Sequence, residues 1–155
     1  MKIQRIYLDT SVIGGCFDNE FAKWSNGLIQ DIRLGNFKAV LSDIVATEMQ
    51  DAPPHVIKIY QELLNLPHEF VNIVPDMVEL ANAYQQHNIL TPKYYDDGLH
   101  IAIATITEVD ALVSWNFKHM VRFDKIRLFN GVNLGYGYKP IQIHSPREVT
   151  IYGAD

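Results

Sequence analysis

The alternation of strand-like and helix-like segments along nearly the whole chain constrains its fold more than any other sequence feature. Short apolar runs indicate strands, and longer stretches with apolar residues at helical spacing indicate helices. Strands are predicted at residues 2–9, 37–42, 69–74, 111–116 and 141–144, and helices at residues 19–36, 43–52, 53–64, 75–87, 91–109, 121–134 and 145–149. Strands that alternate with helices form a mostly parallel sheet covered by helices on both faces, so the sequence predicts an α/β fold.

The size and composition of the chain fit one compact domain spanning residues 1–155. Apolar residues make up 48% and charged residues 20%, as is ordinary for a globular protein. The formal net charge of -5 argues against a general affinity of the surface for nucleic acid, although it leaves room for a local basic groove. The single Cys16 cannot form an internal disulfide, and neither a signal peptide nor a membrane-spanning run is recognised, so we expect a cytoplasmic protein.

Four polar residues stand at or near the ends of predicted strands. Asp9 closes the first strand and Asn116 the fourth, while Glu48 lies on the short helix that follows the second strand. Asp97 lies in "YYDDGLHIAIATI", a helix that is apolar almost all the way round. Because sites in parallel sheets form beyond the carboxyl ends of the strands, these four side chains are predicted to converge at one edge of the sheet.

Each of the acids also has a purely structural interpretation. Asp9 fits a turn or a helix N-cap before "TSV", and Glu48 fits a solvated helix surface. Asp43 is expected to cap the helix that carries Glu48. Asp97 is harder to explain in this way, because a helix that begins at residues 91–92 would place it about a turn and a half inside. A carboxylate within an apolar helix is costly unless it is paired or binds a metal.

The candidate residues favour a divalent metal held by oxygen ligands. The six histidines are scattered, with no His-x-x-x-His pair and no cysteine cluster, so a zinc site is not expected. The sequence also has no glycine-rich phosphate loop and no hydrolase nucleophile elbow. Carboxylates with a carboxamide suit Mg²⁺ or Mn²⁺, and metal-assisted hydrolysis of a phosphodiester is the reaction that such a cluster serves best.

Four segments resemble, in their order and spacing, the motifs of the PIN domain family. They are "IYLDTSVI" (6–13), "SDIVATEM" (42–49), "YDDGLHIAIAT" (95–105) and "LVSWNFKHM" (112–120). Within the family the resemblance is greatest to the group of VapC-type toxins. It implies a three-layer α/β/α sandwich with a central, mostly parallel sheet. It also implies Mg²⁺- or Mn²⁺-dependent ribonuclease activity, with Asp9, Glu48 and Asp97 as the metal-binding acids.

The sequence departs from the family pattern at the fourth acid. Asn116 stands where that acid commonly falls, and His119 occupies the next polar position, which is often acidic. With one carboxylate fewer, we expect one well-held ion rather than two. Asn116 can still coordinate the ion through its carbonyl oxygen or orient the attacking water. Asp96 is expected to be either an outer helper of Asp97 or a solvated neighbour.

Contacts to an RNA substrate are predicted beside the site. The phosphate contacts would be Lys93, Lys118, His119 and Arg122, and the base contacts Tyr94, Tyr95, Trp115 and Phe117, although the last two are more readily interpreted as core or interface residues. The resemblance also implies a homodimer and a cognate antitoxin. Two other functions stay open: a catalytically weak or silent PIN-like domain that binds RNA or a protein, and an enzyme that forms an aspartyl phosphate on Asp9.

Overall fold

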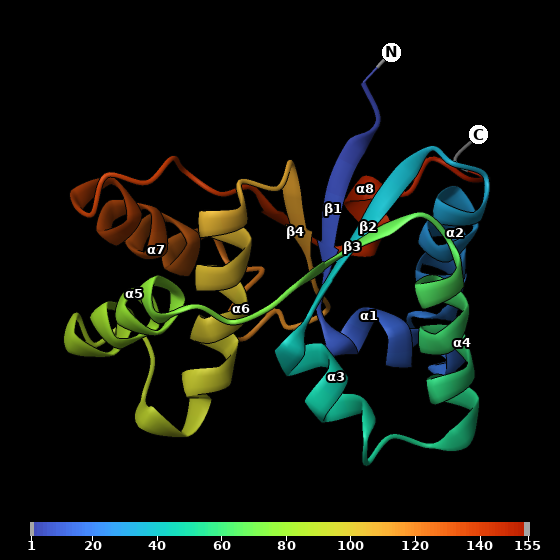
Figure 1. Cartoon of the computed structure of the whole chain (residues 1–155), viewed down its shortest axis with the longest axis horizontal. Helices are drawn as coiled ribbons and strands as arrows, with labels where there is room; N and C mark the ends of the chain where they lie inside the picture. The colour runs from blue at the N-terminus through green and yellow to red at the C-terminus, as the bar shows by residue number, and fades with distance from the viewer. Residues whose placement is uncertain (1, 154–155) are drawn as a thin grey trace.

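The computed structural model describes residues 2–153, and these contain a five-stranded sheet in which every strand pair is parallel (Figure 1). The strands are β1 (Gln4–Leu8), β2 (Phe37–Ser42), β3 (His68–Val71), β4 (Ala111–Val113) and β5 (Ile143–His144). Their order across the sheet is β3-β2-β1-β4-β5. The chain therefore builds the sheet outward from β1 in both directions, first through β2 and β3 and later through β4 and β5.

Helices pack on both faces of the sheet and complete three layers (Figure 1). One face carries α1 (Thr10–Gly14), α2 (Ala22–Arg33) and α4 (Pro54–Asn65), and the other carries α5 (Pro75–Gln86), α6 (Tyr95–Thr107) and α7 (Phe123–Gly135). Shorter elements are α3 (Asp43–Met49) after β2, α8 (Pro146–Val149), and the 3₁₀ helices η1 (Gly15–Phe17) and η2 (Pro92–Tyr94). The predicted α/β/α sandwich with a parallel sheet is thus confirmed.

Each face of the sheet buries its own hydrophobic core. Successive side chains of a strand point to opposite faces, so Tyr7 of β1 packs with the α5–α7 side and Leu8 with the α1–α4 side. The first core is built around Leu80, Tyr84, Ile101, Ile103 and Phe129, and the second around Ile13, Leu28, Ile29 and Leu63. Burial of both faces explains why the strands read as almost continuous apolar runs.

Of the predicted boundaries that differ from those in the structure, three have a clear structural cause. The third strand lies at residues 68–71, so it starts and ends earlier than the predicted 69–74. It ends there because its neighbour, β2, ends at Ser42, which pairs with Val71. The fourth strand stops at Val113, opposite the last residue of β1, so Asn116 lies beyond the strand. The helix predicted from residue 91 begins at Tyr95, because residues 92–94 form a separate 3₁₀ turn.

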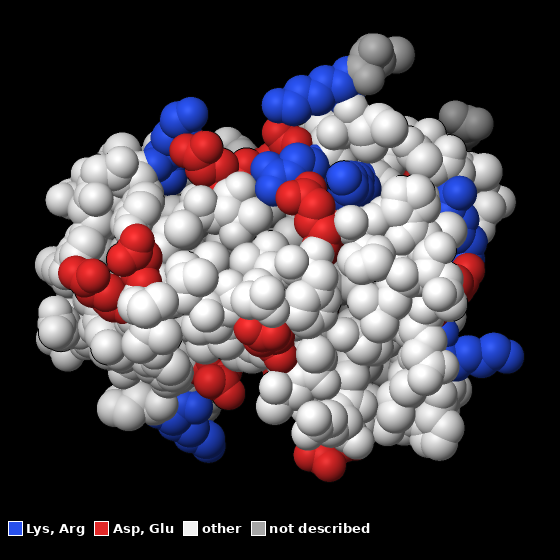
Figure 2. Space-filling view, in the orientation of Figure 1, with Lys and Arg blue, Asp and Glu red and all other residues white. Residues whose placement is uncertain are grey.

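Charged side chains form no single-sign surface on the face in Figure 2. Acidic and basic groups are scattered there, mostly toward the rim, and much of that face is neutral. Attraction of an anionic ligand to this face would need a local cluster of cations rather than an overall field. Within residues 2–153, no helix is long and apolar enough to cross a membrane.

Candidate functional site

The two central strands bring Asp9 and Ser114 together. Leu8 pairs with Val113 across β1 and β4, and Asp9 and Ser114 are the next residues along the two chains. The Ser114 hydroxyl donates to Asp9 Oδ2 over 2.5 Å. This contact lies between β1 and β4, at the switch point where the order of the strands reverses direction across the sheet. A binding crevice in such folds usually forms at this point.

Asp9 is a buried carboxylate with every oxygen in a hydrogen bond. Its side chain is 5% exposed, and Oδ1 accepts from the Ser11 hydroxyl at 2.6 Å and from the Val12 N–H at 3.3 Å. Asp9 is therefore the N-cap of α1, as its structural interpretation expected. Burial raises the pKa of Asp9, while the charge of His100 and the hydroxyl donors act in the opposite direction.

Asp97 faces Asn116 across the site. Asn116 Nδ2 donates to Asp97 Oδ2 at 3.1 Å, and Asp97 is half-buried whereas Asp96 is exposed. Burial raises the pKa of Asp97, and the negative charge of Asp9 raises it further, against the hydrogen bond from Asn116 and the charges of His119 and His100. The negative charge of Asp9 thus acts on Asp97.

The prediction that Asp97 lies about a turn and a half inside its helix is wrong. The helix α6 begins at Tyr95, so Asp96 and Asp97 lie in its first turn. The backbone of Tyr94, at φ -108° and ψ 25°, interrupts the helix between η2 and α6. A carboxylate in the first turn is stabilised by the unpaired N–H groups and the dipole of the helix. The helix end therefore offsets part of the cost of burying Asp97.

Glu48 stands at the rim of the site and is tied to a buried histidine. Glu48 Oε1 is 2.9 Å from His100 Nε2 and accepts from the Thr10 hydroxyl at 3.0 Å. His100 Nδ1 is 2.7 Å from the Tyr7 hydroxyl, which is 2.7 Å from Ser42 Oγ. Burial raises the pKa of Glu48, but the hydrogen bonds from His100 and Thr10 outweigh it, and the net shift is downward.

The sequence patterns did not single out His100 and Ser114. His100 was treated as one of six scattered histidines, yet it is the one polar side chain in the run Gly98–Ala104 and follows Asp97 by three residues. Residues three apart lie on the same face of a helix, so this spacing was a usable signal. Ser114 carried no comparable signal, because its contact to Asp9 depends on the pairing of β1 with β4, whereas Ser11 lies only two residues after Asp9 in "TSV".

The donor chemistry of the site fits a hard divalent cation, but its oxygens are not gathered around one point. Both oxygens of Asp9 accept hydrogen bonds, and Glu48 is turned toward His100. Across residues 2–153, no group of three or more His, Cys, Asp or Glu side chains is placed to hold a metal ion. Asp97 Oδ1 and Glu48 Oε2 make no hydrogen bond to a residue within 2–153, so these two oxygens are available as ligand atoms.

Other expected roles are resolved by the structure. Asp43 does not cap α3: the N-cap is Ser42, and Asp43 Oδ2 instead accepts from the Ile73 N–H at 2.7 Å, which joins α3 to the segment after β3. Trp115 is a core residue, 7% exposed and stacked on Phe21. Phe117, which was interpreted as a core or interface residue, is 49% exposed and does not belong to the core.

The fold of this chain is similar to the folds of solved structures. A toxin–antitoxin complex from Klebsiella pneumoniae matches with a TM-score of 0.55 at 20% identity, over 74% of this chain and 88% of the other. The complex of VapBC2 from Rickettsia felis with a DNA fragment from its promoter matches with a TM-score of 0.58 at 12% identity, over 92% and 98% of the two chains. The chain has a PIN-like fold. No protein-family model and no curated protein sequence matches the chain.

The PIN-like fold accounts for where the candidate residues lie. Its parallel sheet places Asp9 at the end of β1, Glu48 on the helix after β2, and Asn116 beyond β4. Asp97 reaches the same edge from the N-terminal turn of α6. The four residues therefore come from four separate segments of the chain to one edge of the sheet.

Proposed function

We propose that this protein is a Mg²⁺- or Mn²⁺-dependent endoribonuclease, the toxin of a toxin–antitoxin pair, and that residues 1–155 form one PIN domain. The observation that carries the proposal is that Asp9 and Asp97 reach the same edge of a PIN-like sheet, at its switch point, where the charge of Asp9 raises the pKa of Asp97. The pKa of each carboxyl is raised. Such a concentration of buried negative charge is what a divalent cation would neutralise.

The residues of the site would divide the work. Asp9 and Asp97 would hold the ion, with Glu48 reaching it from the rim. A bound Mg²⁺ or Mn²⁺ supplies an activated water and stabilises the negative charge that develops on the phosphate. Ser11 and Ser114 orient Asp9 through their hydroxyls, and the amide of Asn116 orients Asp97.

The proposal extends to a protein partner. Both comparison structures contain toxin–antitoxin proteins, and a cognate antitoxin that inserts a segment into the carboxylate pocket would silence this enzyme. We also propose that the protein forms a homodimer and acts in the cytoplasm. The reducing cytoplasm suits Cys16, which is free and buried.

Cleavage of a degenerate pool of single-stranded RNA with Mn²⁺ tests the activity. A pool avoids the false negative that a sequence-selective enzyme gives on one substrate. We expect cut ends to accumulate with the wild-type protein and to fall by about 100-fold or more with Asp97→Asn, because one metal ligand is lost. Asp96→Asn, a matched change at the exposed neighbouring residue, should cut normally. Equal cleavage by Asp97→Asn and wild type would refute the proposed site.

A second candidate is a catalytically silent PIN-like domain that binds RNA or a protein. The observation that favours it is the engagement of the site oxygens by the protein itself: Asp9 by two serines and Glu48 by His100. In that case the hydroxyls and the imidazole would take the place of a metal. Mn²⁺ affinity separates the two candidates, because only the nuclease needs it.

A further inference from the structure

A cavity beside the candidate site has no role in the function proposed above. It is an open cavity with a volume of about 530 Å³, lined by the end of α5 and the turn after it, by η2, and by His119 and Lys125. The side-chain amides of Gln85, Gln86 and Asn88 are among its polar groups. No carboxylate is among the described residues that line it, although the protein is acidic overall.

Two aromatic rings in contact, tilted against each other, form one wall of this cavity. The rings of Tyr94 and His119 lie 3.9 Å apart between centroids, at an angle of 36°. His119 Nε2 is buried and has no hydrogen-bond partner among residues 2–153. A buried polar nitrogen without a partner costs free energy, and a native protein usually has a reason to tolerate it. This nitrogen is covered in the structure, so a ligand in the cavity would lie against the half-buried rings of Tyr94 and His119 rather than on the nitrogen itself.

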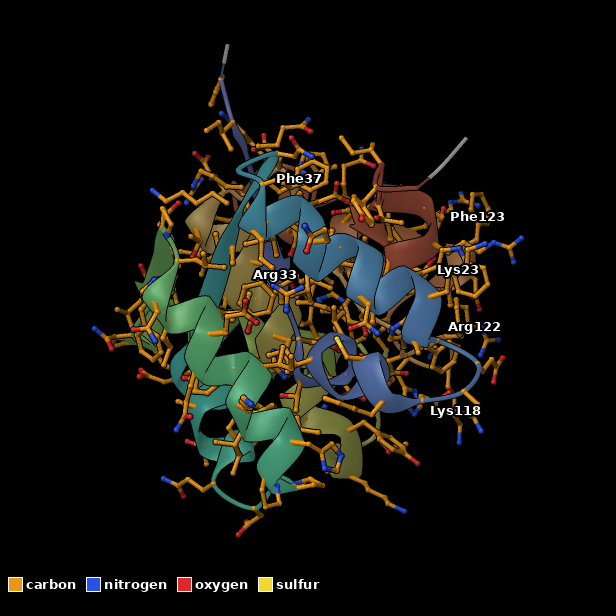
Figure 3. The ribbon with its side chains drawn as sticks, turned by 90° about the vertical axis from the view of Figure 1, so that its right-hand side faces the viewer. Lys23, Arg33, Phe37, Lys118, Arg122 and Phe123 are labelled. Carbon is orange, nitrogen blue, oxygen red and sulfur yellow. The ribbon has the colours of Figure 1, made fainter. Side chains whose placement is uncertain are left out.

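Cations surround the same wall. The Lys93 and Lys118 ammonium groups lie 5.7 and 5.6 Å from the centre of the Tyr94 ring, and Lys125 donates to the Ile89 carbonyl. None of these three lysines forms an ion pair within residues 2–153. Figure 3 shows Lys118 and Arg122 along one edge of the molecule. The cavity is therefore a local basic and aromatic site on an acidic protein.

The cavity is linked to the candidate site by two hydrogen bonds. The His119 N–H donates to Asn116 Oδ1 at 3.0 Å, and Asn116 Nδ2 donates to Asp97 Oδ2 at 3.1 Å. A ligand that contacts His119 in the cavity would thus be separated from the Asp97 carboxylate only by Asn116. For an RNA strand, this is the neighbourhood of the phosphodiester bond to be cut.

We propose that this cavity binds an unpaired nucleobase of a single-stranded RNA, beside the bond that the candidate site would cleave. The inference rests on the proposed ribonuclease function. The volume lies in the range of small-ligand sites, the Tyr94 and His119 wall suits base stacking, and the amides suit the hydrogen-bonding edges of a base. Lys93 and Lys118 would contact the phosphates on either side.

Binding of labelled RNA without a divalent metal tests this inference separately from cleavage. The probes are single-stranded RNAs of about eight nucleotides, each containing only adenine, cytosine or uracil, measured by fluorescence anisotropy in EDTA. Tyr94→Leu should weaken binding about tenfold, because a stacking partner is lost. Gln86→Glu places a carboxylate in the wall without disturbing the core, since Gln86 is exposed, and should weaken binding about fivefold.

Asn82→Asp is the matched control for charge, because Asn82 is exposed on the same helix, outside the cavity. It should bind as the wild type does, and a duplex of the same length should bind more weakly than the single strand. Binding that falls in both cavity variants supports the subsite even if no RNA is ever cut, in which case the proposed function alone fails. The inference is overturned if the wild type binds no RNA, or if Tyr94→Leu and Gln86→Glu both bind RNA as tightly as the wild type does.

Discussion

Asp97 carries a negative charge that the folded protein disfavours. Its pKa is raised above 3.8, chiefly by burial, so between 3.8 and the folded value the native state binds more protons than the unfolded state. The stability that this group contributes is fully present below pH 3.8 and is lost as pH rises through the folded pKa. At pH 7, without metal, the charge therefore lowers the free energy of unfolding.

Asp97→Asn should raise the free energy of unfolding at pH 7, because the amide keeps the polar contact to Asn116 without the buried charge. Urea unfolding in EDTA at pH 7 and pH 4 measures the effect, and the gain over wild type should shrink at pH 4. Asp96→Asn, at an exposed position, is the control and should change little at either pH. A less stable Asp97→Asn at pH 7 would show that the carboxylate is better satisfied than its surroundings indicate.

Asn116→Asp restores an acid at the position where the PIN family commonly has one. We expect about tenfold tighter Mn²⁺ binding, because an added carboxylate contributes charge and a ligand oxygen. The metal-free variant should be less stable, since the Asn116 amide that donates to Asp97 becomes a second anion. Calorimetric titration with Mn²⁺ measures the first effect. Unchanged affinity would mean that position 116 points away from the ion.

Single residues were predictable where one segment of sequence determines their place. Asp9 and Asn116 follow apolar strand-like runs, and Asp97 is conspicuous in an apolar helix. The long-range hydrogen bonds of the site were not predictable, because Ser114 meets Asp9 only through the pairing of β1 with β4, and His100 meets Glu48 across 52 residues of chain.

At the scale of elements, the junction of α1 and η1 is packed against the segment after β4. A Cβ added at Gly15 would lie 2.6 Å from Ser25 Oγ and 2.7 Å from Trp115 Nε1, two atoms joined by a hydrogen bond. Gly15→Ala should therefore lower the free energy of unfolding by about 1–3 kcal/mol. Urea unfolding measures it.

Gly14→Ala is the matched control one residue earlier. A Cβ at Gly14 meets no atom within 4 Å, and its helical φ of -62° suits alanine. This change should stabilise the protein by about 0.4–1 kcal/mol. If both variants were equally stable, the close packing around Gly15 would not exist in solution.

Elements with strong local signals were predicted well, and those limited by their neighbours were not. The first turns of α4 and α5 begin at Pro54 and Pro75, where proline fits a helix start. The same rule failed at Pro92, where the proline starts a 3₁₀ turn and the α-helix begins only at Tyr95. The ends of β3 depend on where β2 stops, which no local pattern reports.

At the scale of the whole molecule, the candidate site lies between the two hydrophobic cores. Asp9 leads into α1 on one side of the sheet, and Asp97 belongs to α6 on the other side. A cation held by both carboxylates would therefore join the two helical layers. Bound Mn²⁺ should stabilise the fold by about 2.7 kcal/mol at a concentration 100 times its Kd.

Calorimetric titration of the metal-free protein with Mn²⁺, with Asp9→Asn, Asp97→Asn and the control Asp96→Asn beside the wild type, shows whether the carboxylates form a metal site. We expect saturable binding that is lost in Asp9→Asn and Asp97→Asn and kept in Asp96→Asn. An absence of binding in the wild type, or binding that survives in Asp97→Asn, would show that they do not form one.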